Sequence, residues 1–295
     1  MSTIDPTSNI PTGLLERLRC PRCAERGDDV KLDRDDDSLV CLACQAKYPV
    51  RDGIPVCVTE TSPLAAERDA ARLKAAVGTD AHRQRDYWEQ DTAHRASDHE
   101  VVAGFARQRW EHLQRRLDLS SVTSALDVGS GNGFSTMYAP PHIDVVATDG
   151  SWRMLSRHPG KERVIADATA LPFPSGSFDL VFCWELLHHV PEPWRALSEM
   201  ARVSRRYVLF FEPNPLNFAQ FLFSIVDTEH RWVLRFSPSY VANQVKRARL
   251  ALQVYERCGL IFPNKTPTPL FRVLRRFPFH IPFIGISQLV VAEKQ

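Results

Sequence analysis

Four cysteines near the start of the chain have the spacing of a metal site. Cys20 and Cys23 form one C-x-x-C pair, and Cys41 and Cys44 form a second pair after 17 intervening residues. Two such pairs can present four thiolates tetrahedrally to one ion, which is the ligand set of structural Zn²⁺ sites. Since four sulfur ligands leave no position for water, we expect zinc with a structural role. Two redox-active cysteine pairs are the alternative. They fit less well, because so small a segment buries too little apolar surface to fold without a bound metal ion.

A second group of residues, three glycines and a nearby carboxylate, has the composition of a ligand-binding loop. Gly129, Gly131 and Gly133 alternate after the apolar run 125–128, so the main chain can turn tightly and approach a ligand closely. Their G-x-G-x-G spacing differs from the G-x-G-x-x-G pattern of dinucleotide-binding domains. Asp127 stands two residues before the first glycine, where it could accept a hydrogen bond from a ligand amino group and would repel a diphosphate.

Two further acids end the next two apolar runs. Asp149 follows residues 143–148 and is placed to accept hydrogen bonds from both hydroxyls of a ribose. Asp167 follows residues 164–166 and could accept from an adenine amino group, while the main-chain amide of Ala168 serves a ring nitrogen. These positions predict a nucleoside-containing ligand, for which a nicotinamide dinucleotide is the weaker candidate.

The order and spacing of the motifs from Asp127 to Val190 resemble the class I methyltransferase family. The resemblance implies S-adenosylmethionine as the cofactor, with Met154 packed on the adenine and Trp184 near the methionine end. The cofactor-binding residues that it implies are Asp127, Gly129, Gly131, Asp149, Met154, Asp167, Ala168 and Trp184.

Two polar segments follow the fourth and fifth predicted strands, where an acceptor could meet the cofactor. In the family that the chain resembles, the position of His188 commonly faces the substrate, whereas that of His189 more often packs or caps. We therefore hypothesise that His188 orients or deprotonates the acceptor, and a histidine with only structural hydrogen bonds is the alternative. Glu212 and Asn214 alternate with prolines, which fix the backbone and suggest substrate contact. A turn with local hydrogen bonds is the alternative there.

These candidate residues need a parallel sheet to bring them together. From Ser124 onward, short apolar runs alternate with helical segments, which is typical of βαβ units. We expect an α/β fold, a doubly wound, mostly parallel seven-stranded sheet of the Rossmann-like methyltransferase type, with a small N-terminal zinc ribbon. The predicted strands are 125–129, 143–148, 164–166, 178–184 and 207–211, followed by a helix over about 239–257 and strands at 260–262 and 286–292.

Composition divides the chain into four parts. They are a disordered lead-in over 1–13, the zinc ribbon over 14–60, a helical linker and N-terminal helices over 61–118, and the methyltransferase domain over 119–295 with an irregular insertion at 212–238. Within the linker, helices are predicted at 61–78 and at about 99–118.

Charge is distributed unevenly although the formal net charge is only +2. Residues 28–37 carry six acids and two bases, whereas residues 231–276 carry ten Lys or Arg and one acid, Glu256. The apolar insertion 216–226, together with the aromatic and basic residues after it, suits RNA, an anionic membrane surface or an amphipathic substrate with an acidic head. A solvated charged face is the plain alternative.

Three functions follow from these features. The first is methyl transfer to a small or amphipathic metabolite, such as a natural product or a lipid-like acceptor, which the apolar insertion and the acidic ribbon favour. The second is rRNA or tRNA base methylation. It is favoured by the basic C-terminal third and by the resemblance of residues 14–58 to the zinc ribbon of bacterial large-subunit rRNA guanine methyltransferases. The third is a non-catalytic cofactor-binding partner protein, against which the intact Asp127, Asp149 and Asp167 argue.

Location and membrane contact follow from composition. No stretch approaches the roughly 18 consecutive apolar residues of a membrane helix, so any membrane contact is expected to be peripheral. Four of the seven cysteines have metal-ligand spacing, which favours a reducing, cytoplasmic setting over a disulfide framework.

Overall fold

An antiparallel sheet forms the beginning of the described chain. The computed structural model describes residues 10–59, 62, 95–226 and 228–294. Asp52 and Gly53 connect two of the strands with φ angles of 48° and 74°, the left-handed conformation of a two-residue hairpin turn. The elements of this N-terminal module (residues 10–59) are α1 (Thr12–Arg17), α2 (Pro21–Ala24), β1 (Leu32–Asp35), β2 (Ser38–Cys41), β3 (Lys47–Arg51) and β4 (Ile54–Cys57).

A larger, mostly parallel sheet follows. Its parallel strands are β5 (Ser124–Val128), β6 (Asp144–Asp149), β7 (Arg163–Ala166), β8 (Phe178–Trp184) and β9 (Ser204–Pro213), in the spatial order β7-β6-β5-β8-β9. The antiparallel strands β11 (Ser287–Lys294) and β10 (Leu250–Cys258) extend it as β9-β11-β10. The predicted doubly wound sheet is confirmed, because the chain builds outward from β5 first on one side and then on the other.

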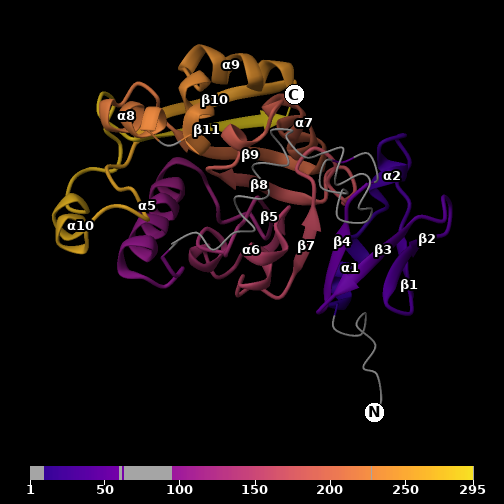
Figure 1. Ribbon diagram of the computed structural model, residues 1–295. Coiled ribbons are helices and arrows are strands. Elements are labelled where there is room, and N and C mark those ends of the chain that lie inside the picture. Colours follow the sequence, from indigo (N-terminus) through magenta and orange to yellow (C-terminus); the bar gives the residue numbers. More distant parts are fainter. Residues whose placement is uncertain (1–9, 60–61, 63–94, 227, 295) are drawn as a thin grey trace.

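Helices cover both faces of the parallel sheet (Figure 1). On one face, Trp110 of α5 (Glu100–Arg116) packs edge-on against Phe182 of β8, with ring centroids 5.2 Å apart. On the other face, α7 (Pro193–Val203) and α9 (Pro238–Arg247) share a core with Val181 of β8. Burial on both faces explains why β8 reads as a continuous apolar run. Shorter helices are α6 (Trp152–Ser156), α8 (Phe218–Val226) and α10 (Thr268–Leu274).

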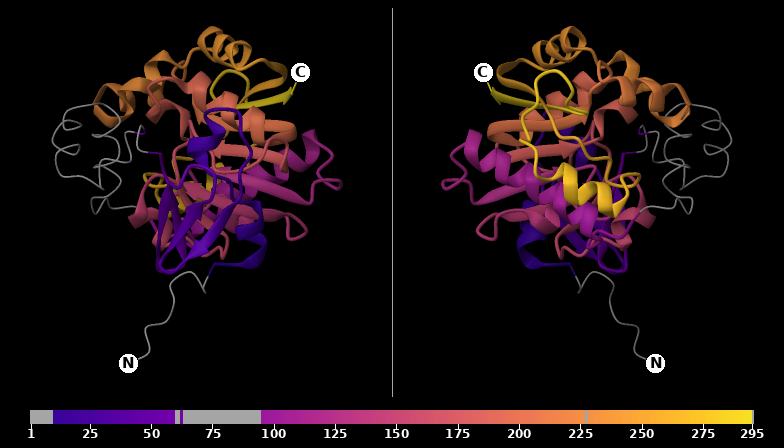
Figure 2. Two further views of the ribbon diagram at one scale, coloured as in Figure 1. Left: turned by 90° about the vertical axis from the view of Figure 1, so that its right-hand side faces the viewer. Right: turned by 90° about the vertical axis from the view of Figure 1, so that its left-hand side faces the viewer.

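The two sheets are continuous. β4 pairs in parallel with β7 through Val56↔Ile165 and Cys57↔Ala166. The main-chain N–H of Arg19 also donates to the carbonyl oxygen of Pro172 at 2.9 Å. The eleven described strands therefore form one sheet, in which the N-terminal module covers the β7 edge (Figures 1 and 2). Covering that edge removes a row of unpaired main-chain groups.

The helix predicted over 239–257 is confirmed up to Arg247 but was too long, and the predicted strand at 260–262 was wrong. The helix ends at Arg247, Arg249 adopts a left-handed φ of 56°, and residues 250–258 form β10. β10 pairs with β11 from Leu250↔Lys294 to Cys258↔Ser287. Helical spacing within the segment could not reveal this long-range pairing. Residues 260–262 have neither helical nor strand structure.

Two other expectations need correction. The insertion at 212–238 is not irregular, because it contains α8 and the 3-10 helix η5 (Thr228–Arg235), and its first two residues belong to β9. The disordered lead-in does not extend to residue 13, since Ile10 is buried and α1 begins at Thr12. Residues 1–9 and the predicted helix at 61–78, apart from Ser62, lie outside the described residues.

Candidate functional site

Five carboxylates lie at the carboxyl edge of the parallel strands. Asp127, Asp149 and Glu212 stand at or next to the last residue of β5, β6 and β9, whereas Asp167 and Glu185 directly follow β7 and β8. Since parallel strands end at the same edge, residues that are distant in sequence converge there. The sequence analysis predicted four of the five and missed Glu185.

Asp127 is fully buried at the end of β5. Its Oδ2 accepts hydrogen bonds from the hydroxyls of Ser135 and Thr136, at 2.5 and 2.7 Å. Its Oδ1 has no partner among the described residues. Burial raises the pKa of Asp127 to about 7, against the lowering effect of the two hydroxyls. A buried carboxylate oxygen without a partner is an acceptor that a ligand ammonium group can use.

The first turn of the glycine loop is set by packing. Gly129 has a φ of 70°, and a Cβ there would lie 2.7 Å from Cδ1 of Leu186. The main-chain N–H groups of Gly129 and Ser130 both donate to the carbonyl oxygen of Thr148, at 2.8 and 2.9 Å. The hydroxyl of Ser130 is buried and has no partner among the described residues. The loop is thus fixed against β6 and offers a second unsatisfied polar group near Asp127.

Asp149 orients the rest of the loop. The main-chain N–H of Gly131 donates to Oδ2 of Asp149 at 2.8 Å, and that of Ser151 donates to Oδ1 at 2.8 Å. Each carboxylate oxygen can accept more than one hydrogen bond, so a carboxylate fixed in this way suits a ribose diol. A Cβ at Gly131 would lie 3.3 Å from Cε of Met154. The structure therefore brings Gly131, Asp149 and Met154 together, and their contact with a cofactor stays a prediction.

Asp167 makes local contacts. Its Oδ1 accepts hydrogen bonds from the main-chain N–H and the hydroxyl of Thr169, at 2.8 and 2.7 Å. Its Oδ2 accepts from the hydroxyl of Ser62, a residue between the N-terminal module and α5. Ala168, beside it, is half-buried. Asp167 thus caps its own turn, and adenine binding by Asp167 and Ala168 stays a prediction.

Trp184 lies in an aromatic cluster on the α5 face of the sheet. Its ring centroid lies 5.7 Å from that of Trp110 and 5.4 Å from that of Phe211. Its Nε1 is buried and has no partner among the described residues. Trp110 in turn donates its Nε1 hydrogen to the carbonyl oxygen of Ser135 at 2.8 Å. Because Ser135 also bonds Asp127, the cluster borders the predicted methionine end.

Sequence reasoning missed a partly buried ion pair beside this cluster. Arg109 of α5 is fully buried, is stacked on Phe211 at 4.3 Å, and pairs with Glu185. It also donates to the hydroxyl of Ser287 at 2.9 Å. The spacing of arginines along α5 does not distinguish this buried residue from its exposed neighbours. The one available signal was the position of Glu185 directly after a predicted strand.

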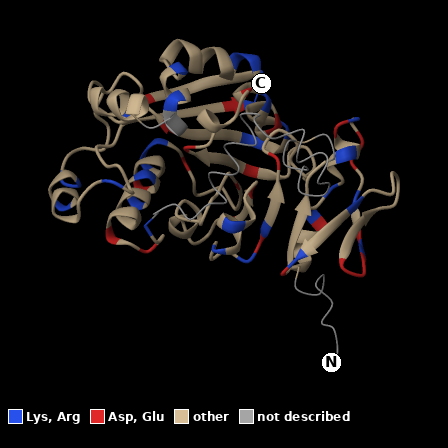
Figure 3. Ribbon diagram, in the orientation of Figure 1, with Lys and Arg blue, Asp and Glu red and all other residues tan. Residues whose placement is uncertain are grey.

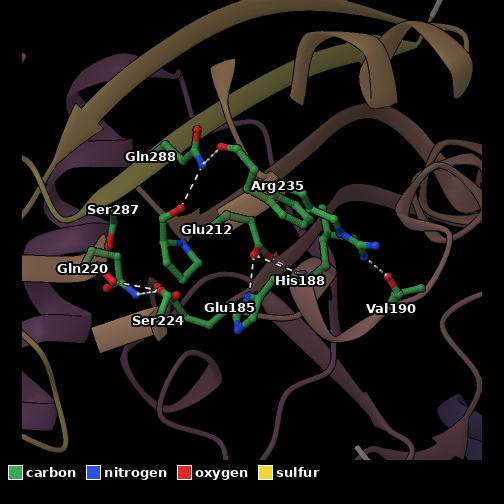
Figure 4. A network of polar contacts seen from close by, with 12 residues as sticks. Glu185, His188, Val190, Glu212, Gln220, Ser224, Arg235, Ser287 and Gln288 are labelled. Atoms are coloured by element: carbon green, nitrogen blue, oxygen red, sulfur yellow. Dashed lines mark hydrogen bonds and ion pairs between the residues drawn. The ribbon is translucent and has the colours of Figure 1, made fainter. Parts of the chain in front are cut away.

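His188 and Glu212 meet at the ends of β8 and β9 (Figure 4). His188 belongs to the short helix η4 (Leu187–His189), and its Nδ1 lies 2.7 Å from Oε2 of Glu212. Glu212 also accepts main-chain hydrogen bonds from Leu187 at 2.6 Å and His188 at 3.2 Å. Both side chains are buried. Burial raises the pKa of Glu212 to about 8, against the lowering effect of these N–H groups and of Arg109.

The structure thus joins two candidates that the sequence analysis treated separately. Glu212 lies within β9 rather than on a loop, and it holds His188. Asn214, its predicted companion, is fully buried and makes the local hydrogen bonds of the alternative interpretation. Its Nδ2 donates to the carbonyl oxygen of Gly285 at 2.7 Å, and its Oδ1 accepts from the main-chain N–H of Leu216 at 3.1 Å.

Gln288 of β11 supports this end of the site (Figure 4). Its Nε2 donates to the carbonyl oxygens of Pro213 and Phe236, both at 2.8 Å. Gln288 thereby ties the end of β9 to the segment between η5 and α9. Nothing in the sequence pattern of β11 marks this buried glutamine as a support for Glu212.

The four cysteines cluster as their spacing predicted. Their sulfur atoms all lie within 4.8 Å of one another. Sγ of Cys20 lies 3.6 Å from that of Cys44, and Sγ of Cys23 lies 3.7 Å from that of Cys41. A tetrahedron with Zn–S bonds of about 2.3 Å has sulfur–sulfur edges of about 3.8 Å, so the cluster fits zinc. The other cysteines, Cys57, Cys183 and Cys258, are buried in the core.

The carboxyl edge also fits S-adenosylmethionine. Asp127 offers a buried acceptor for an ammonium group, and Asp149 is held by two main-chain N–H groups and could accept hydrogen bonds from a ribose. Met154 lies over the loop where the adenine is expected. The arrangement can hold such a cofactor at β5 and β6, and it leaves the His188–Glu212 pair for the acceptor.

Comparison with known proteins gives two matches along the chain. Residues 126–211 match the model of a methyltransferase domain, and residues 13–53 match that of Trm112p-like proteins. Asp127, Asp149, Asp167 and His188 lie in the first match, and the four clustered cysteines lie in the second.

Several curated relatives are methyltransferases. Demethylmenaquinone methyltransferase of Renibacterium salmoninarum is 40% identical over 116 residues, which cover 36% of this chain and 47% of that protein. 27-O-demethylrifamycin SV methyltransferase of Amycolatopsis mediterranei is 30% identical over 131 residues, or 40% and 46% of the two chains. Phosphatidylethanolamine N-methyltransferase of Cereibacter sphaeroides is 40% identical over 91 residues, or 28% and 45%. The chain spans less than half the length of these relatives.

Among solved structures, magnesium protoporphyrin IX methyltransferase from Synechocystis PCC 6803 aligns with 74% of this chain and 100% of that chain, at 14% identity and a TM-score of 0.48. The two family models, the sheet order and the cysteine cluster together assign the parts of this chain. The chain carries a class I S-adenosylmethionine-dependent methyltransferase domain with an N-terminal Trm112p-like module that contains the four clustered cysteines.

Proposed function

We propose that this chain transfers the methyl group of S-adenosylmethionine to a small or amphipathic acceptor of natural-product or lipid-like kind. The observation that carries the proposal is the buried His188–Glu212 pair, which lies at the same sheet edge as Asp127 and Asp149. The apolar helix α8 follows β9 at this edge. The relatives named for demethylmenaquinone, demethylrifamycin and phosphatidylethanolamine support an acceptor of this class.

When bound, the cofactor supplies a methyl group that its sulfonium already activates, so the protein has to align an acceptor and exclude water. Asp127, Gly129, Gly131 and Asp149 would hold the cofactor, with Met154, Asp167, Ala168 and Trp184 completing the predicted site. The aromatic cluster around Trp184 keeps water away from the edge of the sheet between β5 and β9.

His188 would orient the acceptor and take its proton. Burial raises the pKa of Glu212 to about 8, so its carboxyl group is protonated below about that pH. Above that pH, Nδ1–H of His188 donates to the ionised Glu212, and Nε2 carries the lone pair that can accept a proton from a hydroxyl or amine. Glu212 is then a positioning residue that fixes the tautomer and the ring.

Labelled-methyl transfer with the full chain tests this function. The protein is incubated with S-adenosylmethionine carrying a labelled methyl group and, separately, with lipid, small-metabolite and RNA fractions of cells. We expect label in the lipid or metabolite fraction, and we expect His188→Ala to abolish most of it. Label in none of the fractions, from protein that binds the cofactor, would support a non-catalytic cofactor-binding partner instead.

RNA base methylation is the second candidate, and the excess of Lys and Arg over residues 231–276 favours it. The acidic residues on β1 and the following turn argue against RNA binding by the N-terminal module itself, because they would repel the phosphate backbone. Label confined to the RNA fraction of the same assay would establish this second function and exclude the first.

We also propose that the cysteine cluster holds one structural zinc ion. The proposal is supported by four sulfur atoms at tetrahedral spacing, three of which belong to buried cysteines. Elemental analysis should find one zinc per chain, which Cys23→Ser should lose together with thermal stability. A wild-type chain that contains no zinc and is no less stable than after zinc is added would contradict the proposed zinc site.

A further inference from the structure

Apolar side chains are exposed at the end of the molecule opposite the N-terminal module. They belong to α8 and to residues 259–286, which connect β10 to β11 and include α10. Phe218 is 74% exposed, Phe277 is 53% exposed and Phe283 is 84% exposed. Figure 1 shows α8 and α10 at one end and the module at the other, and the right-hand view of Figure 2 shows the first end from the front. We call this the apolar–basic surface (α8 and residues 259–286).

The surface borders the acceptor end of the candidate site. α8 begins a few residues after Glu212 on the chain. Asn214 donates its Nδ2 hydrogen to the carbonyl oxygen of Gly285, and Asn217 donates to that of Ile284, both at 2.7 Å. The exposed tip around Phe283 is therefore tied to the segment that leaves the site.

α10 presents a narrow apolar stripe. Its Phe271 is buried against α5, where Gly104 makes room, since a Cβ there would lie 2.1 Å from the phenylalanine ring. Leu270 and Val273 have the i, i+3 spacing of one helical face, Phe277 follows three residues after the helix ends, and all three are exposed. With Phe271 holding the helix in place, this stripe faces away from the protein.

The charge of the surface is of one sign. Residues 259–286 contain no Asp or Glu, and their basic residues are Lys265, Arg272, Arg275 and Arg276. Arg272 pairs with Glu100 of α5 at 2.8 Å. Among the residues that the structure describes, the other three have no acidic partner within 4 Å, and all three are exposed. Figure 3 shows Lys and Arg but no Asp or Glu along α10.

We propose that the apolar–basic surface docks on an anionic lipid membrane, from which an amphipathic acceptor reaches the site. Exposed phenylalanine and aliphatic side chains flanked by arginines suit the boundary between acyl chains and anionic headgroups. Among the described residues, each helix is too short or too polar to cross a bilayer, so the contact is at the surface of the membrane. The route of the acceptor rests on the proposed function, whereas the docking itself does not.

Two other occupants fit the surface less well. A second copy of the chain would bring Arg275 and Arg276 against like charges, which repel. RNA would be attracted to the arginines, but the aliphatic side chains of Leu270, Val273 and Ile284 offer it neither hydrogen bonds nor stacking.

Vesicle co-sedimentation of the full chain tests the docking. We expect binding to phosphatidylcholine vesicles that contain about 30% phosphatidylglycerol, weak binding to pure phosphatidylcholine, and weaker binding as the salt rises from about 0.1 M to about 0.5 M. Phe277→Ser/Phe283→Ser should lower the partition coefficient at least about tenfold. Arg275→Glu/Arg276→Glu should lower it at least about 25-fold, since each lost cation is worth roughly fivefold.

Two control variants match these changes elsewhere on the molecule. Lys161→Glu/Lys246→Glu changes the net charge equally, at the loop before β7 and at the last turn of α9. Leu42→Ser removes an apolar side chain that is 63% exposed on the N-terminal module. Both controls should bind anionic vesicles within about twofold of wild type, and unchanged thermal stability shows that every variant is folded.

Binding that does not depend on phosphatidylglycerol, or that the controls reduce as much as the test variants, would overturn the proposal. A chain that does not bind vesicles would also overturn the proposal. RNA binding that is unaffected by Phe277→Ser/Phe283→Ser, in such a chain, would identify RNA as the occupant of the surface instead. If the chain transfers methyl groups to soluble acceptors but does not bind vesicles, the docking proposal is rejected and the proposed function is kept. Vesicle binding without methyl transfer to any fraction would reject the proposed function alone.

Discussion

Asp127 and Glu212 are both fully buried carboxylates, and each stands one residue before the end of a parallel strand. Burial raises the pKa of Asp127 to about 7 and that of Glu212 to about 8. Their partners differ. Asp127 accepts two hydroxyl hydrogen bonds on one oxygen and has no described partner on the other. Both oxygens of Glu212 accept main-chain hydrogen bonds, and one of them also contacts the ring of His188.

The difference shows how one sheet edge can serve two purposes. A buried carboxylate with an acceptor to spare is stabilised by a ligand cation, so Asp127 suits the ammonium group of a cofactor. A carboxylate whose oxygens are already engaged fixes its neighbour, so Glu212 suits the positioning of a histidine. The proposed cofactor site is therefore near β5 and β6, and the proposed acceptor site is near the ends of β8 and β9.

The largest effect is expected at the acceptor end. His188→Ala should lower kcat by about 1000-fold, because it removes the group that orients the acceptor and takes its proton. The affinity for S-adenosylhomocysteine, measured by calorimetry, should stay within about twofold if the two ends are separate.

His189→Ala is the matched control, because the two rings are neighbours, with centroids 3.9 Å apart. It should retain activity within about threefold of wild type. A loss of less than tenfold in His188→Ala, or an equal loss in both variants, would reject the base role.

The second effect is on stability. The pKa of Glu212 is about 8 in the folded chain against an ordinary value of 4.5. Between these values the unfolded chain loses a proton that the folded chain keeps, so the free energy of unfolding falls as the pH rises. For Glu212 alone the fall is about 3 kcal/mol between about pH 5 and about pH 8. Glu212→Gln should lack it.

Urea unfolding of wild type and Glu212→Gln at both pH values measures this effect as a difference. The comparison removes the contribution of His158, whose pKa burial lowers to about 4, which makes the protein more stable as the pH rises. If the difference in free energy of unfolding between the two proteins did not change with pH, Glu212 would be ionised at both pH values. Burial would then not raise its pKa as it raises that of Asp127.

The third effect is at the cofactor end. Asp127→Asn should weaken binding of S-adenosylhomocysteine about 100-fold, since it leaves the ligand ammonium group without its buried anion. The thermal stability of the variant without ligand should not fall, because Asp127 has an unsatisfied oxygen in the described structure.

Asp144→Asn is the control for this variant. Asp144 begins β6 at the opposite edge of the sheet, where it pairs with Arg17 at 3.0 Å. Its substitution should leave the affinity unchanged within about twofold. Equal weakening in both variants would mean that Asp127 does not contact the cofactor.

The smallest effect is the pH dependence of cofactor binding. A ligand ammonium group needs Asp127 ionised, so affinity should rise as the pH passes through the pKa of about 7. Calorimetry should find binding about tenfold tighter at about pH 8 than at about pH 6. Asp127→Asn should show a flat profile, and a wild-type profile that is equally flat would assign the ammonium group to another residue.

The parallel half of the fold was predictable from sequence because its signals are local. Each of β5 to β9 is a short apolar run bounded by turns, and the predicted limits differ from the observed ones by a few residues. The acids at the strand ends could be placed for the same reason. Asp127, Asp149 and Glu212 needed only the direction of the strands, which βαβ connections fix.

The C-terminal part was less predictable because its structure depends on distant partners. Residues 250–258 have apolar positions compatible with a helix, and only the pairing of β10 with β11 selects a strand. Arg109 is buried through Glu185 and Ser287, which lie 76 and 178 residues away along the chain. No local pattern in α5 contains that information.

By itself the sequence determined the cluster of four cysteines, the glycine loop and the carboxylates at the strand ends, because these depend on spacing over a few residues. Tertiary structure alone decided that Glu212 holds His188 from 24 residues away and that β4 joins β7. It also decided that α8 and α10 share one exposed, apolar and basic end of the molecule. Those arrangements depend on which distant surfaces bury one another, and that choice is made only when the whole chain packs.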